Sequence, residues 1–210
     1  MTRIKICGIT NTDDARAAVD LGADALGFVL APSPRRIEPE AARAIIRDLP
    51  PFITTVAVVV NELFDDLRRK LDVAGCQAVQ LHGEESPGYV EALSDWRVIK
   101  AFRVRRKGDL DGLADYPRAD AFLLDSRVAG KAGGSGVAFD WRLAREAAAS
   151  GKPIILGGGL SPRNVCAALE AARPYAADVS SGVESAPGRK DLALVREFIQ
   201  AVREFDGREK

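Results

Sequence analysis

Residues 153–162 read Pro-Ile-Ile-Leu-Gly-Gly-Gly-Leu-Ser-Pro, a short apolar run that passes through a glycine turn into a Ser-Pro pair. An apolar run bounded by turn residues is typical of a buried strand. Serine followed by proline is typical of a helix start, because serine caps the helix and proline is tolerated at the first helical position. The stretch therefore predicts one strand followed by one helix.

Units of this kind fill the chain. Strands are expected at residues 3–7, 24–30, 54–60, 78–82, 97–103, 120–125, 153–156 and 176–180. Capping residues predict helix starts at Asn11 or Thr12, at Asn61, at Ser86 and at Ser161. Apolar residues on one helical face predict a last helix over residues 190–205.

Strands that alternate with helices favour a parallel sheet, and eight such units match the (β/α)8 TIM barrel, whose lower size limit is ~200 residues. An open doubly wound sheet is the structural alternative, but it usually has about five or six strands. No charge block or low-complexity stretch divides the chain. We therefore predict a single-domain α/β fold, one (β/α)8 barrel over residues 1–210.

The amino-acid composition limits the kinds of partner and metal site that the protein can have. The 30 basic and 30 acidic side chains cancel, which argues against nucleic acid or an anionic membrane as a partner. The single histidine excludes metal sites built on two or three histidines, and no metal is expected. Three scattered cysteines without a CxxC pair, and no signal or membrane-spanning segment, predict a cytoplasmic protein.

In such a barrel the reactive residues are expected where strands end. Cys7 ends the first strand, and alternation puts it on the inner face with Lys5, whose ammonium is expected to lower the thiol pKa. The alternative is that Cys7 is a small buried apolar residue. Arg36, beside Arg35, could clamp a planar carboxylate, or be a solvated loop arginine. His82 could contact a ligand, or be a histidine at the barrel rim whose hydrogen bonds are made within the protein.

Asp125 ends an apolar strand, where partial burial raises a carboxyl pKa and suits a general acid; a cap or ion-pair role is the alternative. The loop over residues 130–136 is glycine-rich and could close over a ligand. The backbone of the turn with Gly158 and Gly159 could approach a phosphate closely. The residues after the eighth strand strengthen that prediction, because barrels hold phosphate at loops seven and eight; they are Ser180, Ser181 and Gly182.

These residues lie in motifs that resemble the phosphoribosylanthranilate isomerase family of tryptophan biosynthesis. The motifs cover nearly the whole chain, in family order: Lys-Ile-Cys-Gly-Ile-Thr at 5–10, Gly-Phe-Val at 27–29, Ser-Pro-Arg-Arg at 33–36, Gln-Leu-His-Gly at 80–83, Leu-Leu-Asp-Ser at 123–126, Gly-Gly-Ser-Gly at 133–136, Phe-Asp-Trp at 139–141, Gly-Gly-Gly-Leu at 157–160 and Asp-Val-Ser-Ser-Gly-Val-Glu at 178–184.

The resemblance implies an Amadori rearrangement of N-(5-phosphoribosyl)anthranilate to 1-(2-carboxyphenylamino)-1-deoxyribulose 5-phosphate, without metal or organic cofactor. By motif, Cys7 resembles the general base, Asp125 the general acid and Arg36 the anthranilate clamp. The segments around Gly158-Gly159 and Ser181-Gly182 resemble the phosphate site, with Asp178 nearby. The partner implied is a small phosphorylated substrate, and the family includes monomers and homodimers.

Two other readings compete. The related isomerase of histidine biosynthesis performs the same rearrangement on a two-phosphate substrate, but it has an aspartate where this chain has Cys7. A phosphate-binding barrel without catalysis would bind a product analogue and tolerate loss of Cys7.

Overall fold

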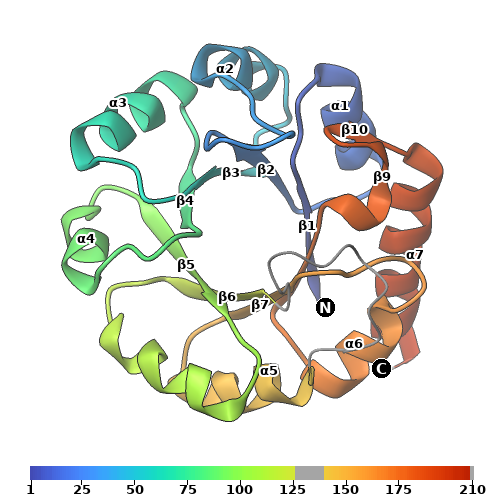
Figure 1. Cartoon of the computed structure of the whole chain (residues 1–210). Coiled ribbons are helices and arrows are strands. Elements are labelled where there is room, and N and C mark those ends of the chain that lie inside the picture. The colour runs from blue at the N-terminus through green and yellow to red at the C-terminus, as the bar shows by residue number, and fades with distance from the viewer. Residues whose placement is uncertain (126–139, 209–210) are drawn as a thin grey trace.

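The computed structural model of the protein describes residues 1–125 and 140–208. Eight parallel strands pair in chain order and close into a barrel, which Figure 1 shows as a central ring surrounded by helices. The predicted (β/α)8 TIM barrel is confirmed. The strands are β1 (Arg3–Cys7), β2 (Ala25–Val29), β3 (Thr54–Val59), β4 (Ala78–Leu81), β5 (Arg97–Arg103), β6 (Ala121–Asp125), β7 (Ile154–Gly157) and β8 (Ala176–Val179).

The outer ring consists of helices that cover the outer face of the strands. They are α1 (Thr12–Asp20), α2 (Pro39–Arg47), α3 (Phe64–Ala74), α4 (Pro87–Ala92), α5 (Arg142–Ala147), α6 (Val165–Ala172) and α7 (Leu192–Arg208). A 3₁₀ helix, η1 (Lys107–Asp115), connects β5 to β6, and two short ones are η2 (Ala148–Ser150) and η3 (Ser181–Val183). A small hairpin of β9 (Glu184–Ala186) and β10 (Arg189–Lys190) lies near α1 (Figure 1).

Helix starts agree only in part with the sequence prediction. Asn11 caps α1 and Ser86 caps α4, each accepting a hydrogen bond from the backbone three residues on. Asn61 is not a cap: its φ is +50°, and α3 begins only at residue 64. Ser161 is not a cap either, because its N–H donates to the Asn164 side chain and α6 begins after that residue.

Alternation along the strands separates two apolar cores. Outward side chains such as Ile4, Ile6 and Phe28 pack under the helices. Inward side chains such as Val56, Ile99 and Ile155 fill the barrel. Lys5 and Cys7 occupy inward positions of β1, as predicted, so the first strand brings an ammonium and a thiol into the barrel interior.

Candidate active site

Strand β1 carries its two reactive side chains toward the carboxyl end of the barrel. The Nζ atom of Lys5 donates to Asp178 Oδ1 at 2.7 Å and to Gln80 Oε1 at 3.0 Å. Gly27, on the neighbouring strand, leaves the space that the sulfur occupies, since a Cβ atom there would lie 2.8 Å from Cys7 Sγ. The lysine and the cysteine therefore share one crowded, water-poor layer of the barrel.

The pKa of the Cys7 thiol differs from the prediction. Burial raises it above the ordinary value, and the ammonium groups of Lys5 and Lys190 pull it down without cancelling that effect. Burial would lower the pKa of Lys5, but Asp178 and Cys7 together outweigh burial and leave it above its usual value. The ammonium therefore stays charged beside a thiol whose pKa is raised rather than lowered.

A row of side chains crosses the barrel mouth from this lysine to Asp125. Gln80 Nε2 lies 2.8 Å from His82 Nδ1, and His82 Nε2 lies 3.1 Å from Asp125 Oδ2. Gln80 is buried, and the side chains of His82 and Asp125 are each partly exposed. The structure thus brings His82 and Asp125, which were predicted separately, into direct contact.

The two adjacent arginines have different surroundings. Arg35 donates to both carboxylate oxygens of Glu184, with Nε–Oε1 at 2.8 Å and Nη2–Oε2 at 2.6 Å. Burial would raise the pKa of Glu184, but hydrogen bonds from Arg35 and Lys190 hold it below its usual range. Arg36 is half-exposed and pairs with Glu38 at the surface. Arg35 is therefore held by a buried ion pair, whereas Arg36 is close to solvent.

Lys190 connects this ion pair to the end of β1. Its Nζ atom donates to the Cys7 carbonyl at 2.6 Å and to Glu184 Oε1 at 2.9 Å. The lysine side chain is fully buried. The backbone that carries the thiol is therefore fixed by a residue from the far end of the chain.

The loops after β7 and β8 lie against each other. Gly158 and Gly159 have φ values of +77° and +72°, which glycine adopts without strain. A Cβ atom at Gly182 would lie 1.9 Å from the Leu160 carbonyl oxygen, so the two loops approach backbone to backbone. Ser181 begins the short helix η3, and Ser180 lies near Gly8 at the end of β1.

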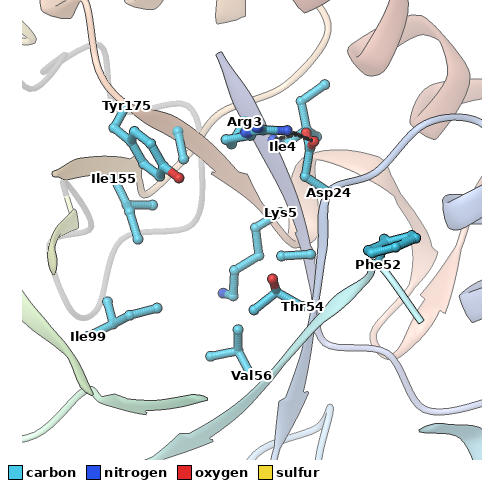
Figure 2. Close-up of a pocket in the computed structure, with 12 residues that line it drawn as sticks. Arg3, Ile4, Lys5, Asp24, Phe52, Thr54, Val56, Ile99, Ile155 and Tyr175 are labelled. Atoms are coloured by element: carbon cyan, nitrogen blue, oxygen red, sulfur yellow. Dashed lines mark hydrogen bonds and ion pairs between the residues drawn. The ribbon is translucent and has the colours of Figure 1, made fainter. Parts of the chain in front are cut away.

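Figure 2 shows the opposite, amino-terminal end of the barrel, which contains a cavity of about 380 Å³. The Lys5 side chain extends into the barrel between Val56, Ile99 and Ile155. Phe52 and Tyr175 lie on different sides of the cavity (Figure 2). The aliphatic part of the Lys5 side chain thus lines the cavity, while its Nζ atom donates to Gln80 and Asp178.

Gln80, Glu184 and Lys190 belong to the site although no role is predicted for them from the sequence. Gln80 could have been found, because it is a polar residue at an inward position of an apolar strand. The pairing of Glu184 with Arg35 spans 149 positions and leaves no local pattern. The predicted glycine-rich loop at 130–136 lies outside the described residues.

Within the described residues, 1–125 and 140–208, no group of three or more metal-ligating side chains gathers. No helix in that part of the chain is both long and apolar enough to cross a membrane.

A family model of N-(5'-phosphoribosyl)anthranilate isomerase matches residues 4–201. The chain belongs to this family. The N-(5'-phosphoribosyl)anthranilate isomerase of Moorella thermoacetica is 52% identical over 206 residues, covering 98% of this chain and 92% of that protein. The resemblance inferred from the motifs is thereby confirmed.

Solved structures of the isomerase family have the same fold. A phosphoribosyl anthranilate isomerase in complex with reduced 1-(o-carboxyphenylamino)-1-deoxyribulose 5-phosphate is 40% identical, with a TM-score of 0.87, over 97% of this chain and 100% of that one. A structure of monomers of the dimeric isomerase from Thermotoga maritima is 38% identical, also with a TM-score of 0.87 and the same coverage.

Proposed function

We propose that the chain converts N-(5-phosphoribosyl)anthranilate to 1-(2-carboxyphenylamino)-1-deoxyribulose 5-phosphate, with Asp125 as general acid and Cys7 as general base. The observation that carries the proposal is that both residues end barrel strands at the same rim, each with its own polar support. Family membership and the relative with a bound reduced product support the substrate class. The reaction needs no cofactor, since every step is a proton transfer or an electron shift within the substrate.

The acid step opens the sugar. Asp125 gives its proton to the furanose ring oxygen as the bond between that oxygen and C1 breaks. The anthranilate nitrogen supplies the electron pair, and a protonated Schiff base forms at C1. The developing aspartate anion keeps the hydrogen-bond contact to His82 at 3.1 Å.

The base step moves the C2 proton to Cys7. The electrons of the C2–H bond form a C1–C2 double bond and neutralise the Schiff-base nitrogen, giving an enolamine that tautomerises to the ketose. The raised pKa of Cys7 makes its thiolate a stronger base but a scarcer one in the free protein. A cationic Schiff base beside the sulfur favours the thiolate, so the base is activated when the substrate has reacted.

Binding is assigned to the remaining predicted residues. Arg36 clamps the anthranilate carboxylate, which is supported by the engagement of Arg35 with Glu184. The loops with Gly158, Gly159, Ser180, Ser181 and Gly182 hold the phosphate, which is supported by their close packing at the rim. His82 contacts the substrate beside Asp125. Asp178 supports the site from inside the barrel, where it accepts a hydrogen bond from Lys5.

The test is a turnover assay with the substrate generated in situ, followed by the loss of anthranilate-type fluorescence. Cys7→Ala and Asp125→Asn should each lower kcat by roughly 10²–10⁴-fold or more while the folded protein still binds a product analogue. Cys76→Ala is the matched control, because Cys76 is also buried but lies away from the rim. Folded wild type that binds the analogue without turnover would replace this proposal with the non-catalytic barrel. Turnover only of the two-phosphate substrate would favour the histidine-pathway isomerase.

We also propose that the protein works in the cytoplasm and forms a homodimer through the amino-terminal end of the barrel. A reducing compartment keeps the catalytic thiol free. Two large apolar side chains that line the cavity at the amino-terminal end are exposed: Phe52, which is 95% exposed, and Tyr175. The dimeric relative from Thermotoga maritima supports a second copy of this chain as the occupant of that surface.

A further inference from the structure

The side chains between Lys5 and Asp125 form an unbroken row of hydrogen-bond contacts across the barrel. The links are Lys5 Nζ to Gln80 Oε1 at 3.0 Å, Gln80 Nε2 to His82 Nδ1 at 2.8 Å, and His82 Nε2 to Asp125 Oδ2 at 3.1 Å. Gln80 and Lys5 are almost completely buried. The two links in the interior therefore have little access to water that could replace a partner.

The chemistry of the lysine sets the direction of every link. An ammonium group only donates hydrogen bonds, so the oxygen of the Gln80 amide must face Lys5. The amide nitrogen, which only donates, then faces His82 Nδ1, and this ring nitrogen must accept. In the neutral ring the proton is therefore on Nε2, which donates to the Asp125 carboxyl group.

We infer that Gln80 is a positioning residue for the reaction: oriented by Lys5, it fixes the tautomer of His82, which in turn holds the general acid. The inference rests on the proposed function, because it takes Asp125 as the acid. With Oδ2 accepting from His82, the proton that Asp125 transfers is carried on Oδ1. The same histidine N–H stabilises the carboxylate that remains after the transfer.

The row connects the two reactive ends without passing protons between them. A neutral amide is neither an acid nor a base near neutral pH, so Gln80 orients its neighbours and does not relay protons between them. Lys5 influences both catalytic residues. Besides its bond to Gln80 it pairs with Asp178 at 2.7 Å, and its charge lowers the pKa of the Cys7 thiol. The buried Lys5 ammonium thus acts on the base directly and on the acid through the side chains of Gln80 and His82.

The experiment uses the fact that the chain has one histidine. Protein labelled with 15N-histidine gives only the ring of His82, and its two nitrogen shifts report which nitrogen carries the proton. Wild type should show protonated Nε2 and unprotonated Nδ1. Gln80→Glu places an acceptor opposite Nδ1 and should put a proton there. Gln80→Met removes the partner without adding a charge and should give a mixture of tautomers.

Activity is measured on the same samples. Loss of the partner that orients a metal-bound histidine costs about 10–100-fold, and we expect kcat to fall by a similar factor in both variants while KM changes about twofold or less. Gln77→Glu is the matched control: Gln77 accepts from the Thr55 N–H near the other end of the barrel, and a carboxylate can keep that bond. It should leave both the tautomer and kcat unchanged.

The outcomes separate the inference from the function on which it rests. Protonated Nδ1 in wild type, or full kcat in a variant whose tautomer has changed, would overturn the positioning role. If Asp125→Asn kept full turnover, the acid assignment would fail and the inference with it, even where the tautomer was read as expected. A changed tautomer together with a lower kcat and a nearly constant KM supports both.

Discussion

The two ends of the barrel are made by the same eight strands, yet their interiors differ in kind. Toward the carboxyl end the inward positions carry Lys5, Gln80 and Asp178, and the lysine donates hydrogen bonds to the other two. Toward the amino end the inward positions carry Val56 and Ile155, which surround a cavity of about 380 Å³. The polar layer and the apolar layer of the barrel interior are therefore only a few residues apart along each strand.

This contrast shows how one fold divides stability from chemistry. Apolar inward residues near the amino end bury surface without needing partners, whereas buried polar groups at the other end must satisfy each other. Among the described residues, no buried side-chain nitrogen or oxygen lacks a partner. We therefore expect substitutions of substrate-contacting residues at the carboxyl end to change binding or turnover, and substitutions at the amino end to change stability or assembly.

Gly182→Ala should have the largest effect of the following changes. The added Cβ atom would lie 1.9 Å from the Leu160 carbonyl oxygen, so the loops after β7 and β8 must separate. Loss of two or three hydrogen bonds to a charged phosphate, each worth about 1.5–3 kcal/mol, should raise KM by roughly 100-fold or more. Gly88→Ala is the control, because nothing lies within 4 Å of its added Cβ atom. An unchanged KM in a folded Gly182→Ala variant would contradict the phosphate assignment.

The paired arginines should respond in opposite ways. Arg36→Met removes the proposed clamp for the anthranilate carboxylate and should raise KM about 10–100-fold, the equivalent of one charged hydrogen bond. Arg35→Met leaves Glu184 buried with Lys190 as its remaining cation, and should lower the free energy of unfolding by about 1–3 kcal/mol. Steady-state kinetics and denaturant unfolding of both variants check this. If Arg35→Met carries the KM effect instead, the assignments must be exchanged.

Much of this contrast could be predicted from the sequence, and the reason is local. Alternating apolar runs place strands, and Lys5 and Cys7 share a face of β1 by spacing alone. Only the resemblance favoured Arg36 over Arg35; spacing could not separate the two arginines, because Glu184 joins Arg35 from 149 positions away. The sign of the Cys7 pKa shift was also beyond the sequence, because burial depends on neighbours such as Gly27 that other strands supply.

The alkylation rates of Cys7 and Cys76 compare the two ends of the barrel through one type of side chain. Because burial raises the pKa of Cys7, its alkylation rate should still be rising with pH above neutrality, about tenfold per unit below the pKa. Cys76 has only burial acting on it, with a pKa of about 12, and should react far more slowly. Peptide mass spectrometry after iodoacetamide treatment measures each site separately.

The same assay tests the lysine. Lys5→Met removes a charge that lowers the thiol pKa, so Cys7 should react more slowly than in wild type at every pH below that pKa. Cys166, exposed on α6, supplies the internal control, since its rate should not change. Equal Cys7 rates in both proteins would show that Lys5 does not act on the thiol.

A substitution in the proposed dimer interface should have the smallest effect on turnover, although it should strongly weaken the dimer. Phe52→Ser should leave kcat within about twofold, because the residue lies at the end of the barrel opposite to Cys7 and Asp125. Burying two phenylalanine side chains in a symmetric dimer contributes about 3–6 kcal/mol, so the dimer Kd should rise by roughly 10²–10⁴-fold. Light scattering across a concentration series measures it.

The matched control for Phe52→Ser lies at the other end of the barrel. Leu63→Ser also removes a large exposed apolar side chain, which is 74% exposed in the segment that follows β3. It should leave the dimer intact, since Leu63 is on the side of the reactive rim. If Leu63→Ser dissociates the dimer and Phe52→Ser does not, the interface covers the rim. The division between a chemical end and an assembling end would then be wrong.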